Sequence, residues 1–252
     1  SEMCIRDSFH TAEAEALLKT AKPYLLPTAG LHPWQAASYF VNDMLPYLTA
    51  CPVIGEIGMD SVWCDVPLDR QEEVFRAQLA IACQMKKPVI LHTKGEEDRI
   101  ASILPEYPNT YLVHWYSCEE YLDQYLALGC YFSIGPDVLW NPPVRTLAAR
   151  VPQNRILIET DGMGAVKWAY EAPEAPKNSQ LADARENTKN VEDALTHTLL
   201  ETAAIRQTEP GVLAKQIQKN LIWGFYLLPN KNLQMRSDPI LFLSLIHISE
   251  PT

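Results

Sequence analysis

Carboxylate and imidazole side chains stand at the ends of four short apolar runs of the sequence: Glu56, His92, His114 and Asp161. Nitrogen and oxygen donors of these types bind Zn²⁺, Mn²⁺ and similar divalent ions. A single histidine at a strand end is more often a polar turn residue, so each position alone carries little information. Four such endings on separate runs favour a metal site, on the condition that the fold brings the run ends together.

The apolar runs that carry these residues have the composition of buried strands. They are short and rich in Val, Ile and aromatic residues, which is typical of parallel strands covered on both faces. The predicted strands are Tyr24–Leu31, Val53–Ile57, Val89–His92, Tyr111–Trp115, Tyr131–Ile134 and Ile156–Glu159. In a parallel barrel all strands end at the same face, and that face holds the active site.

Helical patterns alternate with the predicted strands. The clearest one, Arg70–Lys86, places its apolar residues on one face and ends just before a proline. Further helical patterns are Cys118–Leu128, Val191–Ile205 and Val212–Tyr226. The stretch Glu171–Asn190 is polar and interrupted by prolines, which predicts a surface excursion or a lid. The alternation predicts an α/β fold with one parallel sheet, and no linker divides the chain into two domains.

The composition limits the class of protein. The chain has 252 residues, of which 47% are hydrophobic and 21% charged, and these values exclude a disordered chain. No apolar run reaches the roughly 18 residues of a membrane helix. The net charge of −10 argues against a broad surface for nucleic-acid phosphates. It does not exclude a nucleic-acid substrate in a small cleft, because bound cations would reverse the local charge.

The six cysteines form no CxxC pair and match no zinc-finger or haem spacing. No secretory signal opens the chain, so we expect reduced thiols and a cytoplasmic protein. Nothing in the sequence indicates a membrane contact or an obligate protein partner.

Several motifs follow one another in the order found in TatD-type metal-dependent hydrolases, and the sequence resembles that family from about Leu17 to Tyr226. The motifs are Gly30-Leu31-His32-Pro33-Trp34, Ile54-Gly55-Glu56-Ile57-Gly58-Met59-Asp60, Phe75-Arg76-Ala77-Gln78-Leu79, Pro88-Val89-Ile90-Leu91-His92, Val113-His114 and Leu157-Ile158-Glu159-Thr160-Asp161. The ordered set is specific, whereas no single motif is.

The resemblance implies a fold and a chemistry. The family fold is a TIM-like (β/α)8 barrel whose centre of one or two divalent metals (Zn, Mn or Mg) hydrolyses phosphodiester bonds, often in DNA. By this resemblance Glu56 bridges two metals, and His92 and His114 bind the second. Asp161 would bind the first metal and act as the catalytic residue that takes the proton of the attacking water. Two cations can generate hydroxide at neutral pH and hold the attacking and leaving oxygens.

The sequence departs from the family at its first strand. The family opens with a His-x-His pair, which supplies two ligands to the first metal, and no such pair occurs here. Phe9–Ala21 is predicted to be a helix that leads into the Tyr24 strand, the third strand in the family order. We therefore expect an N-terminally truncated, incomplete barrel of about six parallel strands. Its gap would lie between the Tyr24 and Ile156 strands, and its catalysis would be impaired.

The two ends of the sequence match no element pattern. Residues 1–8 and 244–252 resemble translated adapter sequence, with ordinary frayed ends as the alternative. Excluding both leaves one predicted domain, a metal-dependent hydrolase barrel over residues 9–243. We expect the two excluded segments to contribute nothing to the core.

Three further positions are candidates for substrate binding: His32, Lys94 and Trp63. His32 lies near the site in the resembled family, but it is equally typical of a hydrogen-bonded turn. Lys94 can hold a phosphate as a point charge, or be a solvated loop lysine. Trp63 can stack on a base, or simply pack.

The leading interpretation is a TatD-like hydrolase of phosphodiester bonds that uses a metal-activated water. One alternative is an amidohydrolase-type enzyme for a small amide, ester or lactone, which the negative charge slightly favours. The other is a non-catalytic fragment that keeps the fold but cannot hold the first metal.

Overall fold

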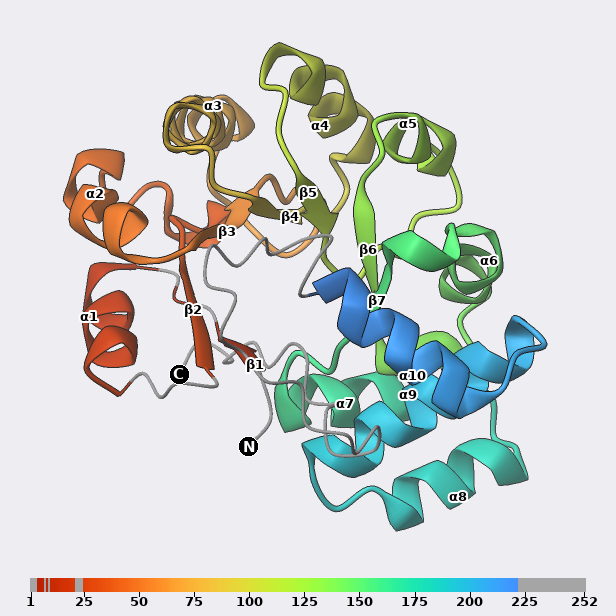
Figure 1. The fold of residues 1–252 in the computed structure, drawn as a ribbon. Helices are drawn as coiled ribbons and strands as arrows, with labels where there is room; N and C mark the ends of the chain where they lie inside the picture. The colour runs from red at the N-terminus through yellow and green to blue at the C-terminus, as the bar shows by residue number, and fades with distance from the viewer. Residues whose placement is uncertain (1–3, 7, 9, 21–24, 222–252) are drawn as a thin grey trace.

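The computed structural model describes residues 4–6, 8, 10–20 and 25–221. Its strands form one sheet in which each strand pairs in parallel with the next along the chain. The strands are β1 (Cys4–Arg6), β2 (Leu25–Ala29), β3 (Val53–Gly58), β4 (Val89–His92), β5 (Tyr111–Val113), β6 (Tyr131–Ile134) and β7 (Ile156–Ile158). Figure 1 shows them following an arc, with α1 to α6 on its outer side.

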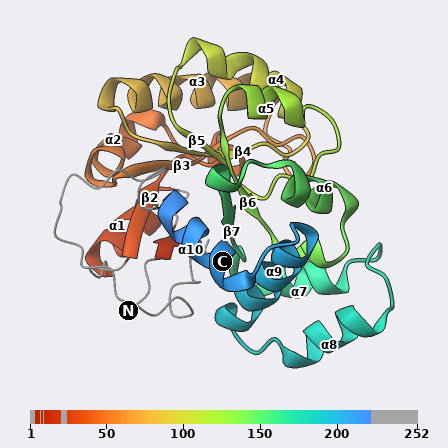
Figure 2. The ribbon, with the colours of Figure 1, turned by 45° about the vertical axis from the view of Figure 1, so that its right-hand side comes forward.

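Helices join successive strands and continue after β7. Those described are α1 (Thr11–Thr20), α2 (Val41–Ala50), α3 (Leu68–Met85), α4 (Glu97–Ile103), α5 (Leu122–Ala127), α6 (Pro142–Arg150), α7 (Gly162–Glu171), α8 (Ser179–Asn187), α9 (Val191–Ile205) and α10 (Pro210–Lys219). Figure 2 shows α7, α8 and α9 gathered together. The stretch predicted to be a surface excursion therefore contains a helix, α8, which packs on α7 and α9.

The six predicted strands are all present, as β2 to β7, and the predicted parallel α/β sheet is confirmed. Every residue of β3 to β7 is buried. These strands are covered on both faces, which is why their sequences are continuously apolar rather than alternating. One connected hydrophobic core includes buried residues from Ala14 to Leu221. The domain limits at residues 9 and 243 stay a prediction, and residues 244–252 lie outside the described ranges.

The N-terminal segment differs from the expectation. Residues 4–6 form β1, which pairs with the edge of β2 and makes seven strands in place of six. Next to it, the Ser8 hydroxyl donates to the Thr28 carbonyl at 2.8 Å, and the Gly30 amide donates to the Ser8 carbonyl at 3.2 Å. A strand at the edge of a sheet pairs through backbone groups alone, so its side chains need not be apolar. With three residues, β1 is also too short to show a strand pattern in the sequence. Thus residues 4–6 and Ser8 contribute to the fold, whereas the rest of the segment 1–8 lies outside the described residues.

At the other end of the sheet, no described strand pairs with the outer edge of β7. The Asn220 side-chain amide, just after α10, donates to the backbone carbonyls of Gln153 and Ile156, each at 2.8 Å. The gap was predicted to lie between the strands now seen as β2 and β7. On the β2 side, β1 fills part of it, and on the β7 side α10 lies next to it.

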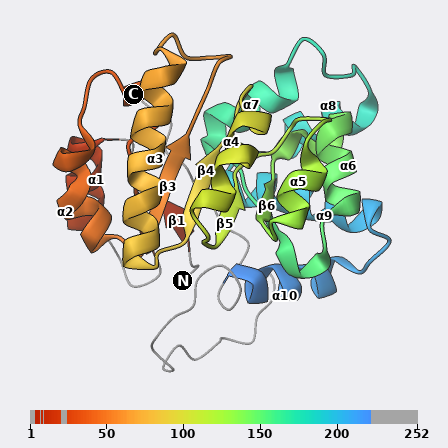
Figure 3. The same ribbon diagram turned by 90° about the horizontal axis from the view of Figure 1, so that it is seen from above.

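Helix α3 fixes the loops that follow β2 and β3. Its apolar face is buried, and Figure 3 shows the helix running alongside β3. Two buried glutamines interrupt that face. The Gln78 side chain accepts from the Leu31 amide at 2.7 Å and donates to the Leu31 carbonyl at 3.0 Å. Gln71 does the same for Asp60, at 2.7 and 3.0 Å. Each glutamine thus supplies the backbone hydrogen bonds that a strand loses where it ends.

We expect Gln78→Met to destabilise the protein by roughly 2 to 4 kcal/mol, because it leaves the buried amide and carbonyl of Leu31 without partners. This corresponds to a drop of about 5 to 15 °C in the melting temperature, measured by circular dichroism. Gln84→Met on the exposed side of the same helix is the matched control and should change the melting temperature by less than about 2 °C. Equal melting temperatures for the two variants would contradict this role.

No helix in the described ranges is long and apolar enough to cross a bilayer. Among the side chains that the structure describes, five cysteines are free thiols: Cys51, Cys64, Cys83, Cys118 and Cys130.

Candidate active site

The four predicted metal-binding side chains meet at the carboxyl ends of the strands. Glu56 lies in β3, His92 ends β4, His114 follows β5, and Asp161 follows β7. Glu56 Oε2 is 3.5 Å from His92 Nδ1, and Glu56 Oε1 is 3.7 Å from His114 Nε2. His114 Nε2 is also 3.8 Å from Asp161 Oδ2. The fold therefore brings these four residues together, with Glu56 between the two histidines.

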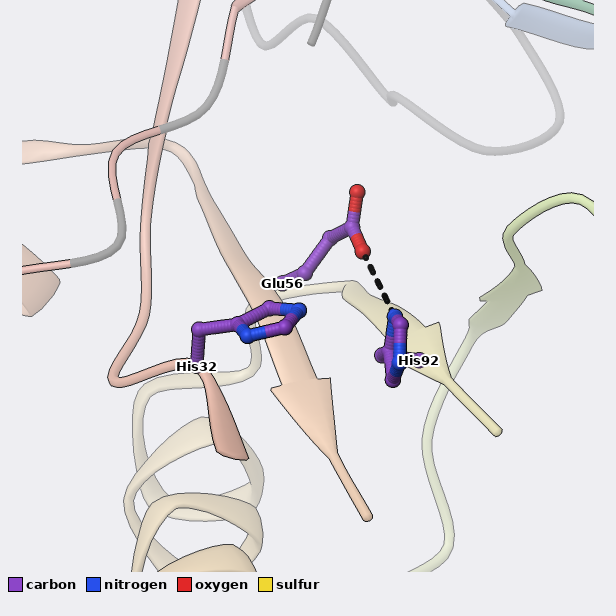
Figure 4. Close-up of side chains that lie close together, drawn as sticks. All are labelled: His32, Glu56 and His92. Atoms are coloured by element: carbon purple, nitrogen blue, oxygen red, sulfur yellow. Dashed lines mark ion pairs between the residues drawn. The ribbon is translucent and has the colours of Figure 1, made fainter. Parts of the chain in front are cut away.

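His32, predicted at the substrate, lies inside the same cluster. It follows β2, and its ring centroid is 4.6 Å from that of His92. One donor atom each from His32, Glu56 and His92 lie within 4.8 Å of one another, and all three residues are buried. Figure 4 shows the two rings and the carboxylate turned toward a common point. Position therefore makes His32 a candidate ligand rather than a substrate contact alone.

The donor set fits a divalent cation. Glu56 is 2% exposed, and its Oε1 atom has no hydrogen-bond partner among the described residues. A buried carboxylate oxygen without a partner is costly unless a cation or a proton donor occupies the space beside it. Imidazole nitrogens and carboxylate oxygens together suit Zn²⁺ and Mn²⁺, and the carboxylates also suit Mg²⁺.

Two buried carboxylates orient the histidines from behind, and sequence reasoning gave them no role. Asp60 Oδ2 lies 2.9 Å from His92 Nε2, which leaves His92 Nδ1 directed at Glu56. Glu159 Oε2 lies 2.6 Å from His114 Nδ1, which leaves His114 Nε2 directed at Glu56. A carboxylate behind a ligating histidine fixes its tautomer and raises its basicity. Both residues ended or followed predicted strands, and that position was the available signal.

The ionisation of the cluster follows from its burial and its charges. Burial works against the charged form of Glu56, but His114 and His92 hold the pKa of Glu56 down at about 2. Burial also opposes charge on His114, yet Glu159 and Glu56 raise the pKa of that imidazole well above its usual value. Burial raises the pKa of Asp161 to about 6. Since ligating histidines must be neutral, a divalent cation would compete with the proton on His114.

A cavity of about 440 Å³ opens above the cluster. Lys94 and Trp63, the other two predicted substrate contacts, both line it. Lys94 Nζ lies 4.7 Å from the centroid of the Trp63 ring and 3.3 Å from the Ser117 hydroxyl. Trp115, Asp137 and Trp168 also line the cavity and were not predicted as site residues. Trp115 directly follows His114, and this position was the available signal for it. No feature of the sequence indicated that Trp168, in α7, would line the cavity.

A curled parallel sheet with histidines and carboxylates gathered at its carboxyl edge defines the class of metal-dependent barrel hydrolases. The family described as "TatD related DNase" matches residues 3–225 of the chain. The chain belongs to this family. The predicted TatD-type resemblance is therefore confirmed, and membership places the chain among hydrolases that act on phosphodiester bonds.

Individual relatives agree with this assignment. The chain is 28% identical over 219 residues to a "3'-5' ssDNA/RNA exonuclease TatD" of Rahnella sp., an alignment that covers 81% of the chain and 78% of the relative. It is 34% identical over 173 residues to the protein of the same name in Edwardsiella piscicida, covering 63% of the chain and 66% of the relative.

Solved structures show the same fold. A TatD homolog from Escherichia coli K12 superposes with a TM-score of 0.70 at 20% identity, covering 89% of this chain and 86% of that one. A TatD family hydrolase from Entamoeba histolytica gives a TM-score of 0.68 at 15% identity, covering 89% and 84%. The predicted TIM-like barrel class is therefore confirmed.

Proposed function

We propose that the chain removes nucleotides one at a time from the 3' end of single-stranded DNA or RNA, with a divalent metal as cofactor. The observation that carries this proposal is the meeting of Glu56, His92, His114 and Asp161 beneath one cavity. The names of the relatives support the choice of substrate and direction. The cytoplasmic location and the absence of an obligate partner stay predictions.

Glu56 is the central ligand in this proposal. Its Oε2 faces His92, with His32 close by, and its Oε1 faces His114, which in turn faces Asp161. These residues would hold one cation on the His32 and His92 side, and a second, more weakly, on the Asp161 side. A bound divalent cation supplies the Lewis acidity that phosphodiester hydrolysis needs at neutral pH.

The other side chains bind and orient the substrate. Asp161 has a side chain that is 29% exposed, so it is the carboxylate within reach of a water that enters the cavity. It takes the proton from that water as the water attacks phosphorus. The bond from phosphorus to the 3' oxygen of the preceding nucleotide breaks, and that oxygen takes a proton from solvent. Lys94 faces a phosphate oxygen as a point charge. Asp60 and Glu159 keep the two histidines in the orientation that ligation requires.

A single-stranded 20-mer labelled at its 5' end tests the proposal. With Mn²⁺ or Mg²⁺ present, we expect a ladder of products that shortens one nucleotide at a time, because hydrolysis begins at the unlabelled 3' end. Excess chelator should abolish the ladder. Early release of the labelled nucleotide would refute the direction, and hydrolysis of a small ester or lactone without any cleavage of the strand would refute the substrate class.

A further inference from the structure

Four indoles line the cavity beside the metal-binding cluster. Trp34 packs on the histidines of the cluster, and the other three, Trp63, Trp115 and Trp168, form what we call the tryptophan wall. The ring centroids of Trp63 and Trp168 are 6.0 Å apart, and those of Trp115 and Trp168 are 6.3 Å apart, all edge to face. Trp63 is 54% exposed and Trp168 is 52% exposed. Large apolar side chains left open beside a polar cluster are typical of a surface that binds a ligand.

One end of the wall is tied to the metal-binding cluster through Asp60. The Asp60 Oδ1 atom accepts the backbone amides of Val62 and Trp63, each at 2.8 Å. The other oxygen of the same carboxylate lies 2.9 Å from His92 Nε2. A single buried carboxylate therefore sets both the orientation of a candidate metal ligand and the position of the Trp63 loop.

The other end is tied through Glu159. Its Oε1 atom accepts the Trp115 backbone amide at 2.8 Å, and its Oε2 atom lies 2.6 Å from His114 Nδ1. The distance between the tryptophan wall and the cluster is thus fixed from both sides. A ligand held against the wall would have one defined part of its structure placed at the cluster.

A buried carboxylate and a glycine fix the position of the Trp115 indole. Its Nε1 donates to Asp137 Oδ1 at 2.8 Å, and the second oxygen of that buried carboxylate accepts from Asn141 at 2.7 Å. Gly135 leaves the space that the ring needs, since a Cβ there would lie 2.3 Å from the indole. The ring face of Trp115 is therefore preset rather than a product of chance packing.

The charges around the cavity favour recognition of a base over recognition of many phosphates. Lys94 is the one Lys or Arg among the described residues that line it. Lys94 also lies over the Trp63 ring, so one phosphate contact sits next to the wall. With a net charge of −10, the chain has no excess of cations for a long strand.

We infer that the tryptophan wall is a nucleobase subsite, which holds the unstacked base of the terminal nucleotide while Lys94 faces the adjoining phosphate. This inference rests on the proposed function and names the part of the substrate that the same site recognises. Every nucleobase has a π-face, so the subsite accepts all four bases. Because Lys94 is the one cationic side chain among the described residues of the subsite, the affinity for the strand should depend weakly on salt. A plot of the logarithm of affinity against the logarithm of salt concentration should have a slope of about −1 or shallower.

Two 20-mers that differ only at the 3' terminal residue test the inference, one with thymine and one with an abasic tetrahydrofuran. The wild-type protein should show a kcat/KM for removal of that residue at least about tenfold higher when the base is present. Trp168→Leu and Trp63→Leu should bring this ratio close to one. Phe40→Leu, an exposed aromatic residue outside the cavity, is the matched control and should keep the wild-type ratio.

Binding measured by tryptophan fluorescence in chelator separates this inference from the proposed function. We expect the base-bearing strand to bind at least about tenfold more tightly than the abasic strand, a result that does not depend on hydrolysis. Equal binding and equal kcat/KM for the two strands would overturn the inference while leaving the nuclease proposal intact. Base-dependent binding without hydrolysis of either strand would support the inference and refute the nuclease proposal.

Discussion

Glu56→Gln should lower metal-dependent hydrolysis of single-stranded DNA by about a thousandfold or more. The carboxylate lies between His92 and His114, and its low pKa keeps it ionised at all physiological pH values. The amide has nearly the same shape but carries no charge, so it cannot neutralise a divalent ion in a buried site. A thousandfold loss corresponds to about 4 kcal/mol of transition-state stabilisation. Initial rates in Mn²⁺, together with calorimetric titration of the ion, measure both effects.

Glu97→Gln is the matched control for this prediction. Glu97 lines the same cavity from the start of α4 but takes no part in the cluster. Its replacement should leave the affinity for Mn²⁺ within about threefold of the wild-type value. If Glu56→Gln also stayed within threefold, the position of Glu56 between the histidines would not be a metal site.

Supplying the His-x-His pair should raise activity by about a hundredfold or more. In the resembled family this pair provides two ligands to the first metal, whereas this chain supplies the carboxylates of Glu56 and Asp161 for that metal. We would replace residues 1–8 with the first strand, first helix and second strand of a TatD relative. The second grafted strand would take the place of β1 at the edge of β2, and the first would lie toward β7. Calorimetry should then show two tightly bound ions in place of one.

Asp161→Asn within the graft is the control for the chemistry. The amide can neither ligate as an anion nor accept a proton, so turnover should disappear while the grafted fold remains. Two ions bound tightly by the ungrafted chain, with full activity, would contradict the requirement for a His-x-His pair.

The sheet could be predicted because its strands are buried on both faces. Such strands have to be continuously apolar, so runs such as Val89–His92 and Ile156–Ile158 were visible without any knowledge of the fold. Helix α9 was predicted with its observed limits, Val191–Ile205. By contrast, α7 begins Gly-Met-Gly and has weak helix propensity at its start, so its packing on the Pro136–Leu139 turn, α8 and α9 is needed to stabilise it as a helix.

The cluster could be predicted in part for the same reason. Parallel strands end at one edge, so Glu56, His92 and His114 had to meet there once the sheet was correct. The direction of the His32 side chain depends on the conformation of the turn after β2, and the sequence pattern does not predict that conformation. Trp168 reaches the cavity only because α7 folds back over it, which is a tertiary contact without a local signature.

The strict chain order of the sheet has a consequence for how the protein folds during synthesis. Each strand pairs with the strand before it, as Thr28 does with Val53 and Leu112 with Tyr131, so every pairing closes a loop of a few tens of residues. The entropy lost in closing such loops is modest and similar from one pairing to the next. From β2 onward, no strand has to wait for a distant partner to leave the ribosome. The sheet can therefore grow by one strand and one helix at a time, and an emerging hydrophobic strand remains unpaired only briefly.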